Sequence, residues 1–87
     1  MKVKKVLLQA YYDLNGEYLV FPDNPLHNQT FENVDVKISK TTNTICGIRF
    51  AVDVITISGQ EPIECKLVSR RKNAEGTLVI QLCQDWG

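Results

Sequence analysis

The chain has 87 residues, of which 44% are hydrophobic and 23% charged, and ten basic side chains balance ten acidic ones. This length predicts one globular domain spanning 1–87 with a small core. The zero net charge disfavours a nucleic-acid binder, because phosphate neutralisation supplies most of the affinity of such proteins, and no run approaches the roughly 20 apolar residues that span a bilayer.

The first two predicted strands, 2–12 and 17–21, alternate apolar and polar residues with a period of two. Asn15-Gly16 between them predicts a type I′ turn, because both central positions of that turn need positive φ. The resulting register places Tyr12 opposite Leu19 and Ala10 opposite Phe21. One face of this hairpin then points into the core. The other face is unusually apolar for a solvent-exposed surface, and it holds Leu7, Tyr11, Tyr18 and Val20.

Residues 22–30 contain two prolines and predict a loop, because proline interrupts the ladder of a sheet. The next strands are expected at 31–40 and 44–58, joined by a three-residue loop at 41–43. This register keeps one face apolar by pairing Ile38 with Cys46, Val36 with Ile48 and Val34 with Phe50. The apolar phase of the second strand then shifts by one residue, which predicts a β-bulge near Asp53-Val54. Gly47 is a second position where this strand can bend.

The last two strands are expected at 63–71 and 77–84, with a four-residue loop at 73–76 and a tail at 85–87. Their register sets Leu67 against Leu82 and Ser69 against Ile80. Together the six segments predict an all-β fold, an antiparallel meander of five to six strands curled into a small barrel or a two-layer sandwich. In this arrangement the thiols of Cys46 and Cys65 are buried, and that of Cys83 points outward.

Two basic clusters are candidates for an anion or acidic-partner site. In a strict meander, the lysines that open the first strand lie at one end of the sheet, and the cluster that closes the fifth strand lies at the other. The two therefore cannot merge into one stripe along a nucleic-acid backbone. The second cluster forms a candidate binding rim with a lysine from the third strand, and the alternative is a solvated rim without a partner. This rim consists of Lys40, Arg70, Arg71 and Lys72.

The tyrosines of the outer face, with Trp86, have the chemistry to stack on bases. Such platforms usually interleave aromatic residues with Lys and Arg, whereas Leu7, Gln9 and Val20 surround Tyr11 and Tyr18. An apolar face of this kind more often packs against a second copy of the chain or against the chain's own tail. We therefore expect self-association through Tyr11, Tyr18 and Val20 rather than stacking.

Catalytic and metal-binding motifs are not found. His27 is the only histidine and lies in a polar loop without the ligand spacing of a metal site. Three cysteines lack a CxxC pair, and no secretory signal precedes them, which favours free thiols in the cytoplasm. The sequence thus predicts a stand-alone binding domain that is not an enzyme, has no cofactor and no membrane partner, and forms a homodimer or binds another protein. The alternatives are a barrel that encloses an apolar small molecule and, less favoured, one that binds an oligonucleotide.

Overall fold

The computed structural model describes residues 1–84 and, at Ile45, the backbone only. Its residues form strands and turns, and the described part contains no helix, so the all-β prediction is confirmed. No helix of residues 1–84 has the length and apolarity to cross a bilayer. The strands are β1 (Lys2–Leu14), β2 (Glu17–Val20), β3 (Thr30–Ile45), β4 (Ile48–Ile57), β5 (Ile63–Lys72) and β6 (Leu78–Cys83).

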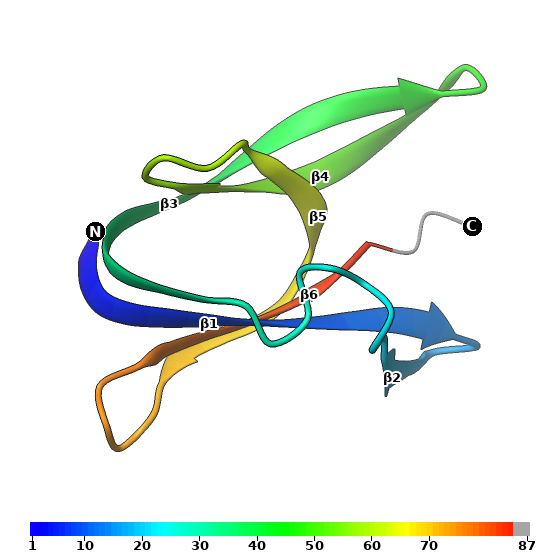
Figure 1. Cartoon of the computed structure of the whole chain (residues 1–87). Coiled ribbons are helices and arrows are strands. Elements are labelled where there is room, and N and C mark those ends of the chain that lie inside the picture. The colour runs from blue at the N-terminus through cyan, green and yellow to red at the C-terminus, as the bar shows by residue number, and fades with distance from the viewer. Residues whose placement is uncertain (85–87) are drawn as a thin grey trace.

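The sheet closes into a barrel (Figure 1). The strand order is β2-β1-β3-β4-β5-β6, and a further pairing joins β1 to β6. The closed barrel therefore consists of β1, β3, β4, β5 and β6, while β2 is an extra strand on β1. This result confirms the small barrel and excludes the two-layer sandwich.

Two pairings depart from a strict antiparallel meander. The closing pair is parallel, with Val6–Tyr11 of β1 alongside Leu78–Cys83 of β6. In addition, β3 pairs with β1 rather than with β2. The physical reason is that β2 has only four residues and occupies the distal part of β1, so the loop after it returns the chain to the free proximal part of β1. As a result, β2 and β3 run in the same direction.

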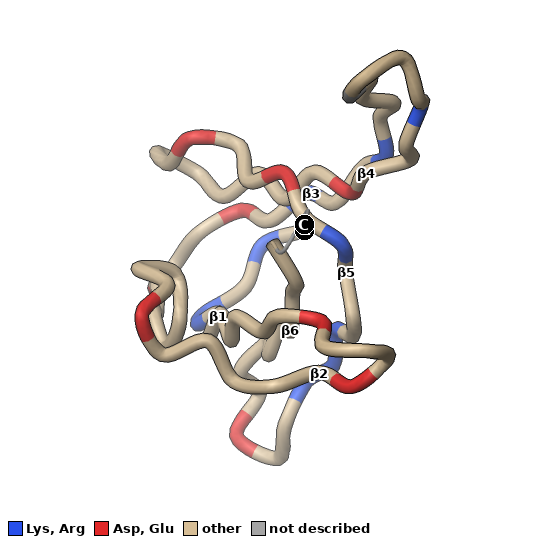
Figure 2. Tube along the Cα trace, turned by 90° about the vertical axis from the view of Figure 1, so that its right-hand side faces the viewer, with Lys and Arg blue, Asp and Glu red and all other residues tan. Residues whose placement is uncertain are grey.

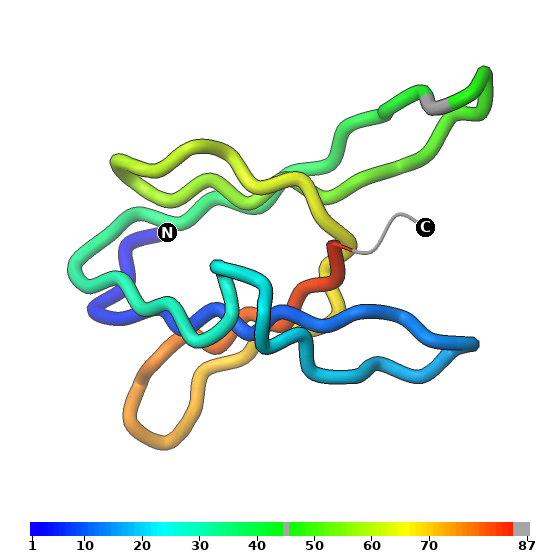
Figure 3. Tube along the Cα trace, turned by 45° about the vertical axis from the view of Figure 1, so that its right-hand side comes forward, coloured from blue at the N-terminus to red at the C-terminus, as the bar shows by residue number. Residues whose placement is uncertain are grey.

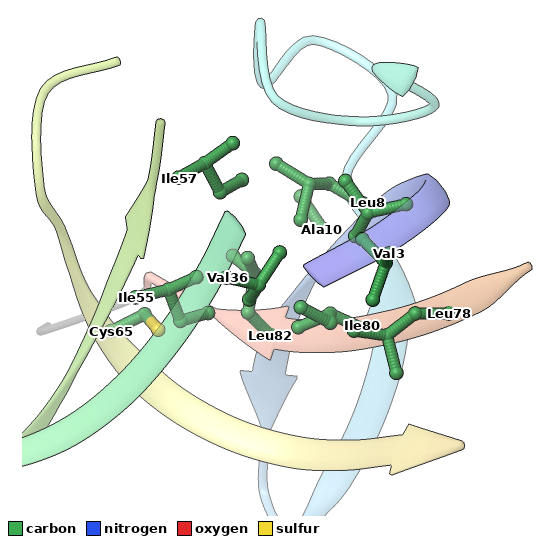
Figure 4. Packing of buried hydrophobic residues seen from close by; sticks show 11 residues of the cluster. Val3, Leu8, Ala10, Val36, Ile55, Ile57, Cys65, Leu78, Ile80 and Leu82 are labelled. Atoms are coloured by element: carbon green, nitrogen blue, oxygen red, sulfur yellow. The ribbon is translucent and has the colours of Figure 1, made fainter. Parts of the chain in front are cut away.

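The core lies inside the barrel and is built from the inward-facing positions of the alternating strands. Leu8 and Ala10 of β1 are fully buried, as the sequence predicted. They pack with side chains from every other barrel strand (Figure 4). Each fully buried aliphatic side chain contributes about 1.5–3 kcal/mol by leaving water. The largest of them are Leu8, Ile55, Ile57, Ile80, Leu82 and Val6.

The first hairpin has the predicted turn. Asn15 and Gly16 have φ values of 51° and 89°, as a type I′ turn requires. Tyr12 lies opposite Leu19, and the N–H of Phe21 donates to the carbonyl oxygen of Ala10 at 3.0 Å. Local turn chemistry therefore determined this register correctly.

The second hairpin has a different turn from the predicted one. Its two central residues are Cys46 and Gly47, with φ values of 51° and 76°, and the predicted loop at 41–43 lies inside β3. The predicted pairings are therefore wrong: Ile38 lies opposite Ile55, and Val36 lies opposite Ile57. β-branched threonines at 41, 42 and 44 favour a strand, so the chain continues to the first glycine that accepts positive φ.

The predicted bulge at Asp53-Val54 is absent, because β3 and β4 pair through ten consecutive residues from Val36 to Ile45. The phase change has another cause. Up to Val52, β4 pairs only with β3, and from Asp53 onward it also pairs with β5. The covered face of the strand therefore changes where β4 enters the barrel. Val52 and Ile55 are both buried although they lie on opposite faces.

A register shift occurs instead in β5, between Leu67 and Ser69. Leu67 lies opposite Leu82 as predicted, but Ser69 lies opposite Gln81 rather than Ile80. The shift belongs to the sharply curved part of the barrel wall, where β5 leaves β4 and pairs with β6. An extra residue on one strand bends it and increases its twist.

Candidate functional site: two hairpin arms and a cleft

Two hairpins extend beyond the barrel from the same side (Figures 1 and 3). The β1–β2 arm comprises residues 11–20, and the β3–β4 arm comprises residues 40–53. In the second arm, β3 has left β1 after Asp35, and β4 meets β5 only from Asp53 onward. Residues 41–52 are therefore a two-stranded ribbon, and each strand has one edge without a neighbouring strand.

The inner face of the β3–β4 arm is defined as the side that carries Val52. It lies on the opposite side of β4 from the core residues Ile55 and Ile57, because β3 and β4 pair without a bulge. Val52, near the base, is 3% exposed. Phe50 follows on the same face two residues nearer the tip and is 41% exposed, and Ile48 at the tip is 60% exposed. The same row of side chains thus passes from a buried position to solvent within one strand.

In the β1–β2 arm the apolar row continues the core-facing side of the strand. Leu8 and Ala10 are buried on the core-facing side of β1, and Leu14 continues this alternation at 51% exposure. Leu19, opposite Tyr12, is 36% exposed on the same side. A two-stranded ribbon with one apolar face is marginally stable in water alone, so both arms present surface that a partner can cover.

A cleft of about 620 Å³ lies between the β2–β3 loop and the β4–β5 turn. Leu26, Phe31 and Ile63 form its apolar floor and are partly buried against the core. Its rim carries amides and carboxylates but no lysine or arginine. The rim residues are Gln29, Gln60, Glu61, Pro62, Glu64 and Gln84.

Hydrogen bonds hold both walls of the cleft. Asn24 is 8% exposed in the β2–β3 loop. Its side-chain oxygen accepts from the N–H of Leu26 at 2.9 Å, and its amide donates to Oε1 of Gln84 at 3.0 Å. Gln84 in turn donates to the carbonyl oxygen of Glu64 at 3.2 Å. The loop is therefore tied to β5 across the end of β6, and the cleft is preformed.

The cleft adjoins the β3–β4 arm of the same chain. The side-chain amide of Asn43 donates to Oε2 of Glu64 at 3.4 Å. Asn43 lies opposite Phe50, so the two share the inner face of the arm. The apolar inner face therefore leads from the tip of the arm to the acidic rim of the cleft.

Tyr11, Tyr18 and Val20, the residues predicted to bind a partner, lie together on the outer face of the β1–β2 arm. Tyr11 lies opposite Val20. Its hydroxyl accepts from Nε2 of Gln81 at 3.0 Å and donates to Oε1 of Gln9 at 3.3 Å. Intramolecular contacts thus already engage part of this face.

The Tyr18 ring also has a neighbour within the chain. Nζ of Lys66 lies 5.5 Å from the centre of this ring. The side chain of Tyr18 is the main cause of the raised pKa of Lys66. Lys66 lies opposite Cys83 on β6, so the outer face of the arm folds over the barrel wall.

The predicted basic rim is divided. Lys40 lies on the β3–β4 arm, where Nζ is 3.9 Å from Oδ1 of Asp53. Arg70, Arg71 and Lys72 lie at the end of β5 and pair with Leu78–Ile80 of β6. The structure therefore does not bring Lys40 together with the other three residues.

The predicted separation of the basic clusters is wrong. Lys72 lies opposite Leu78, and Leu78 lies opposite Val6. The end of β5 is thus level with the start of β1, where Lys2, Lys4 and Lys5 lie. The error follows from the pairing of β3 with β1, which reverses the direction of every later strand relative to a strict meander.

His27 has a structural role in the β2–β3 loop. Its Nδ1 accepts a hydrogen bond from the N–H of Ala10 at 3.1 Å. This nitrogen carries no proton in that arrangement, and the bond fastens the loop to β1. Among the described residues, no group of three or more His, Cys, Asp or Glu side chains has the arrangement of a metal site.

The cysteines are free, and their environments differ from two of the three predictions. Cys65 is buried as predicted, and burial is the largest cause that raises its pKa to about 12. Cys83 lies on the outward side of β6 as predicted, opposite Lys66 and Tyr11, but it is buried there. Cys46 is exposed, because it occupies the turn rather than a core position.

Ile48, Phe50 and the cleft are the features that sequence reasoning missed. The available signal was Gly47, since a two-residue turn at 46–47 places Ile48 at the tip of a hairpin. The cleft has no local signal, because its walls come from three distant segments. Trp86, considered above as a stacking or covering residue, lies outside the described residues. No family model, curated protein or solved structure matches the chain.

Proposed function

We propose that the protein is a non-enzymatic protein-interaction domain that forms a homodimer through the inner faces of its two arms. The observation that carries this proposal is the exposure of Ile48 and Phe50 on the same face as the buried Val52. Apolar side chains of this size at the end of a lone ribbon favour association, because covering them removes apolar area from water.

Backbone groups support the same conclusion. The outer edges of β2 and of the β3–β4 arm carry N–H and C=O groups that no neighbouring strand of the described chain pairs. Between the base pair Lys40–Asp53 and the tip, the arm holds a single charge, Arg49. Natural edges that must stay unpaired usually carry lysines or prolines, and residues 41–52 have neither.

Charge and composition favour a protein partner over a nucleic acid. The net charge is zero, and basic and acidic positions are spread around the trace (Figure 2). We place the protein in the cytoplasm, which is supported by three free thiols. An enclosed apolar ligand is less favoured. Aliphatic side chains fill the barrel interior, and Phe50 is exposed on the arm.

Sedimentation equilibrium from low to high micromolar protein tests the proposal. We expect a monomer–dimer equilibrium in the wild type, and a dimer weakened at least about tenfold in Phe50→Ser, since a central aromatic is typically a major contributor to binding. Val20→Ser is the matched control, because Val20 is 50% exposed on the opposite face of the other arm.

A wild-type monomer throughout this range contradicts the proposed function. Loss of the dimer in Val20→Ser but not in Phe50→Ser contradicts the assignment to the inner faces. Because both side chains are exposed, circular dichroism of each variant is expected to match the wild type, which separates lost association from lost folding.

A further inference from the structure

The cleft between the β2–β3 loop and the β4–β5 turn matches the tip of the β3–β4 arm in chemistry. Its floor is apolar, and its rim carries the exposed carboxylates Glu61 and Glu64 without a basic residue. A segment that fills it must therefore offer apolar side chains and a positive charge.

The arm tip offers both on opposite faces of one strand. Ile48 and Phe50 lie on the inner face, and Arg49, opposite Thr44, lies on the outer face. Arg49 is exposed and makes no ion pair among residues 1–84. The outer part of the arm shows blue but no red positions in Figure 2. The tip is thus a cationic, apolar wedge, and it points away from the β4–β5 turn (Figures 1 and 3).

The position of the cleft relative to the arm makes a reciprocal contact possible. Ile63 and Glu64 of the cleft lie opposite Ile55 and Val54 of β4, next to the base pair Lys40–Asp53, so the cleft lies at the base of the arm and the wedge at its tip. The side chain of Glu64 reaches along the arm to Asn43. Five residue steps separate Lys40 from Ile45, about 17 Å of strand. Two arms that lie antiparallel with their inner faces together therefore place each tip at the base of the other, and a two-fold axis closes the assembly.

We propose that the cleft is the receptor for the β3–β4 tip of a second copy of this chain. Ile48 and Phe50 pack on the floor formed by Leu26 and Ile63, and the guanidinium of Arg49 pairs with the carboxylates of the rim. This inference rests on the proposed homodimer and assigns the two surfaces that form it.

Complementary charge reversal tests this assignment. Variant A is Arg49→Glu, and variant B combines Glu61→Lys with Glu64→Lys. We expect each variant alone to dimerise at least about tenfold more weakly than the wild type, because like charges then face each other. An equimolar mixture of A and B is expected to form a heterodimer within about threefold of the wild-type affinity, since both of its contacts again join opposite charges.

The matched control is Glu75→Lys, a reversal of an exposed carboxylate in the β5–β6 turn. It is expected to leave its own dimer unchanged. Its heterodimer with variant A is expected to be no tighter than that of the wild type with variant A, because one of the two contacts still joins like charges. Native mass spectrometry distinguishes A–B from A–A and B–B by mass, and circular dichroism checks that each variant is folded.

The outcomes separate this inference from the proposed function. A monomeric wild type overturns both. A wild-type dimer that neither charge reversal weakens supports the homodimer and overturns the role of the cleft. A chain shortened to end at Gln84 tests the chain's own tail as the occupant. Dimerisation that appears only in this shortened chain assigns the apolar surface to residues 85–87 and overturns the inference.

Discussion

The barrel and the arms use the same strands and the same alternation, but large apolar side chains are covered only in the barrel. On β4, Ile55 and Ile57 are buried, whereas Ile48 and Phe50, on the opposite face of the same strand, are exposed. The difference is the number of neighbours: β4 has two partner strands from Asp53 onward and one before it. Alternation therefore determines which way a side chain points, and the strand topology determines whether other residues cover that side chain.

The largest expected contrast is between Leu8 in the barrel and Phe50 in the arm. Leu8→Ala leaves a cavity in a closed wall and is expected to lower the free energy of unfolding by about 2–5 kcal/mol. Phe50→Ala removes a larger side chain but is expected to lower it by about 1 kcal/mol or less, because that side chain is partly solvated.

Urea denaturation at a protein concentration where the chain is monomeric measures both values. The midpoint is expected to fall with little change in slope for Leu8→Ala. Equal losses in the two variants would show that the arm packs as firmly as the barrel in the monomer, and the comparison between the two regions would then be wrong.

The two hairpins show how far the sequence predicts this fold. Asn15-Gly16 determined the register of the β1–β2 hairpin, because asparagine and glycine accept positive φ with little strain. Cys46-Gly47 uses the same turn, but cysteine at φ 51° is unusual, so Thr41-Thr42-Asn43 looked like the better loop. An error of a few residues in that loop moved Phe50 from an exposed arm to a predicted core pair with Val34.

The pairing of strands that are distant in the sequence had no signal in the local residue pattern. The alternation in β1 is the same whether β2, β3 or β6 lies beside it, so neither the parallel closure with β6 nor the return of β3 to β1 follows from residue pattern alone. These two pairings place the basic ends of β1 and β5 together and build the cleft from the β2–β3 loop and the β4–β5 turn. The candidate site was therefore predictable only in part, as an apolar surface on hairpins.

A loss of stability of intermediate size is expected from a substitution at the point where the barrel meets the β1–β2 arm. His27→Ala removes the acceptor of the Ala10 N–H, and a partly buried donor without a partner costs about 1–2 kcal/mol. Hydrogen exchange of the Ala10 amide is expected to accelerate, since the β2–β3 loop is then held less firmly. Asp23→Ala in the same exposed loop is the control. Unchanged exchange at Ala10 in His27→Ala would mean that the loop docks without its histidine.

The smallest effect expected at neutral pH is a difference in the reactivity of the thiols. One thiol lies on the β3–β4 arm and two lie in the barrel, so their rates of modification measure the two regions separately. Cys46 is exposed at the tip of the β3–β4 arm, whereas Cys65 and Cys83 are buried. A disulfide reagent is therefore expected to modify one thiol per chain quickly, and none quickly in Cys46→Ser. Since the thiolate is the reactive form, the raised pKa of Cys65 protects it further. Fast modification of a second thiol in the native protein would show that the barrel opens as readily as the arm.

Above neutral pH, ionisation of the Cys65 thiol is expected to destabilise the barrel. The ordinary pKa of the thiol is 9.0, and burial, with Asp53 and Cys83 as smaller causes, raises that of Cys65 to about 12 in the folded chain. Between these values the unfolded chain has released a proton that the folded chain retains, so the free energy of unfolding falls as pH rises. Cys65→Ala removes this contribution, and its stability is expected to decline less steeply than that of the wild type from pH 9 upward. Identical slopes would mean that the Cys65 thiol ionises as easily in the folded barrel as in the unfolded chain.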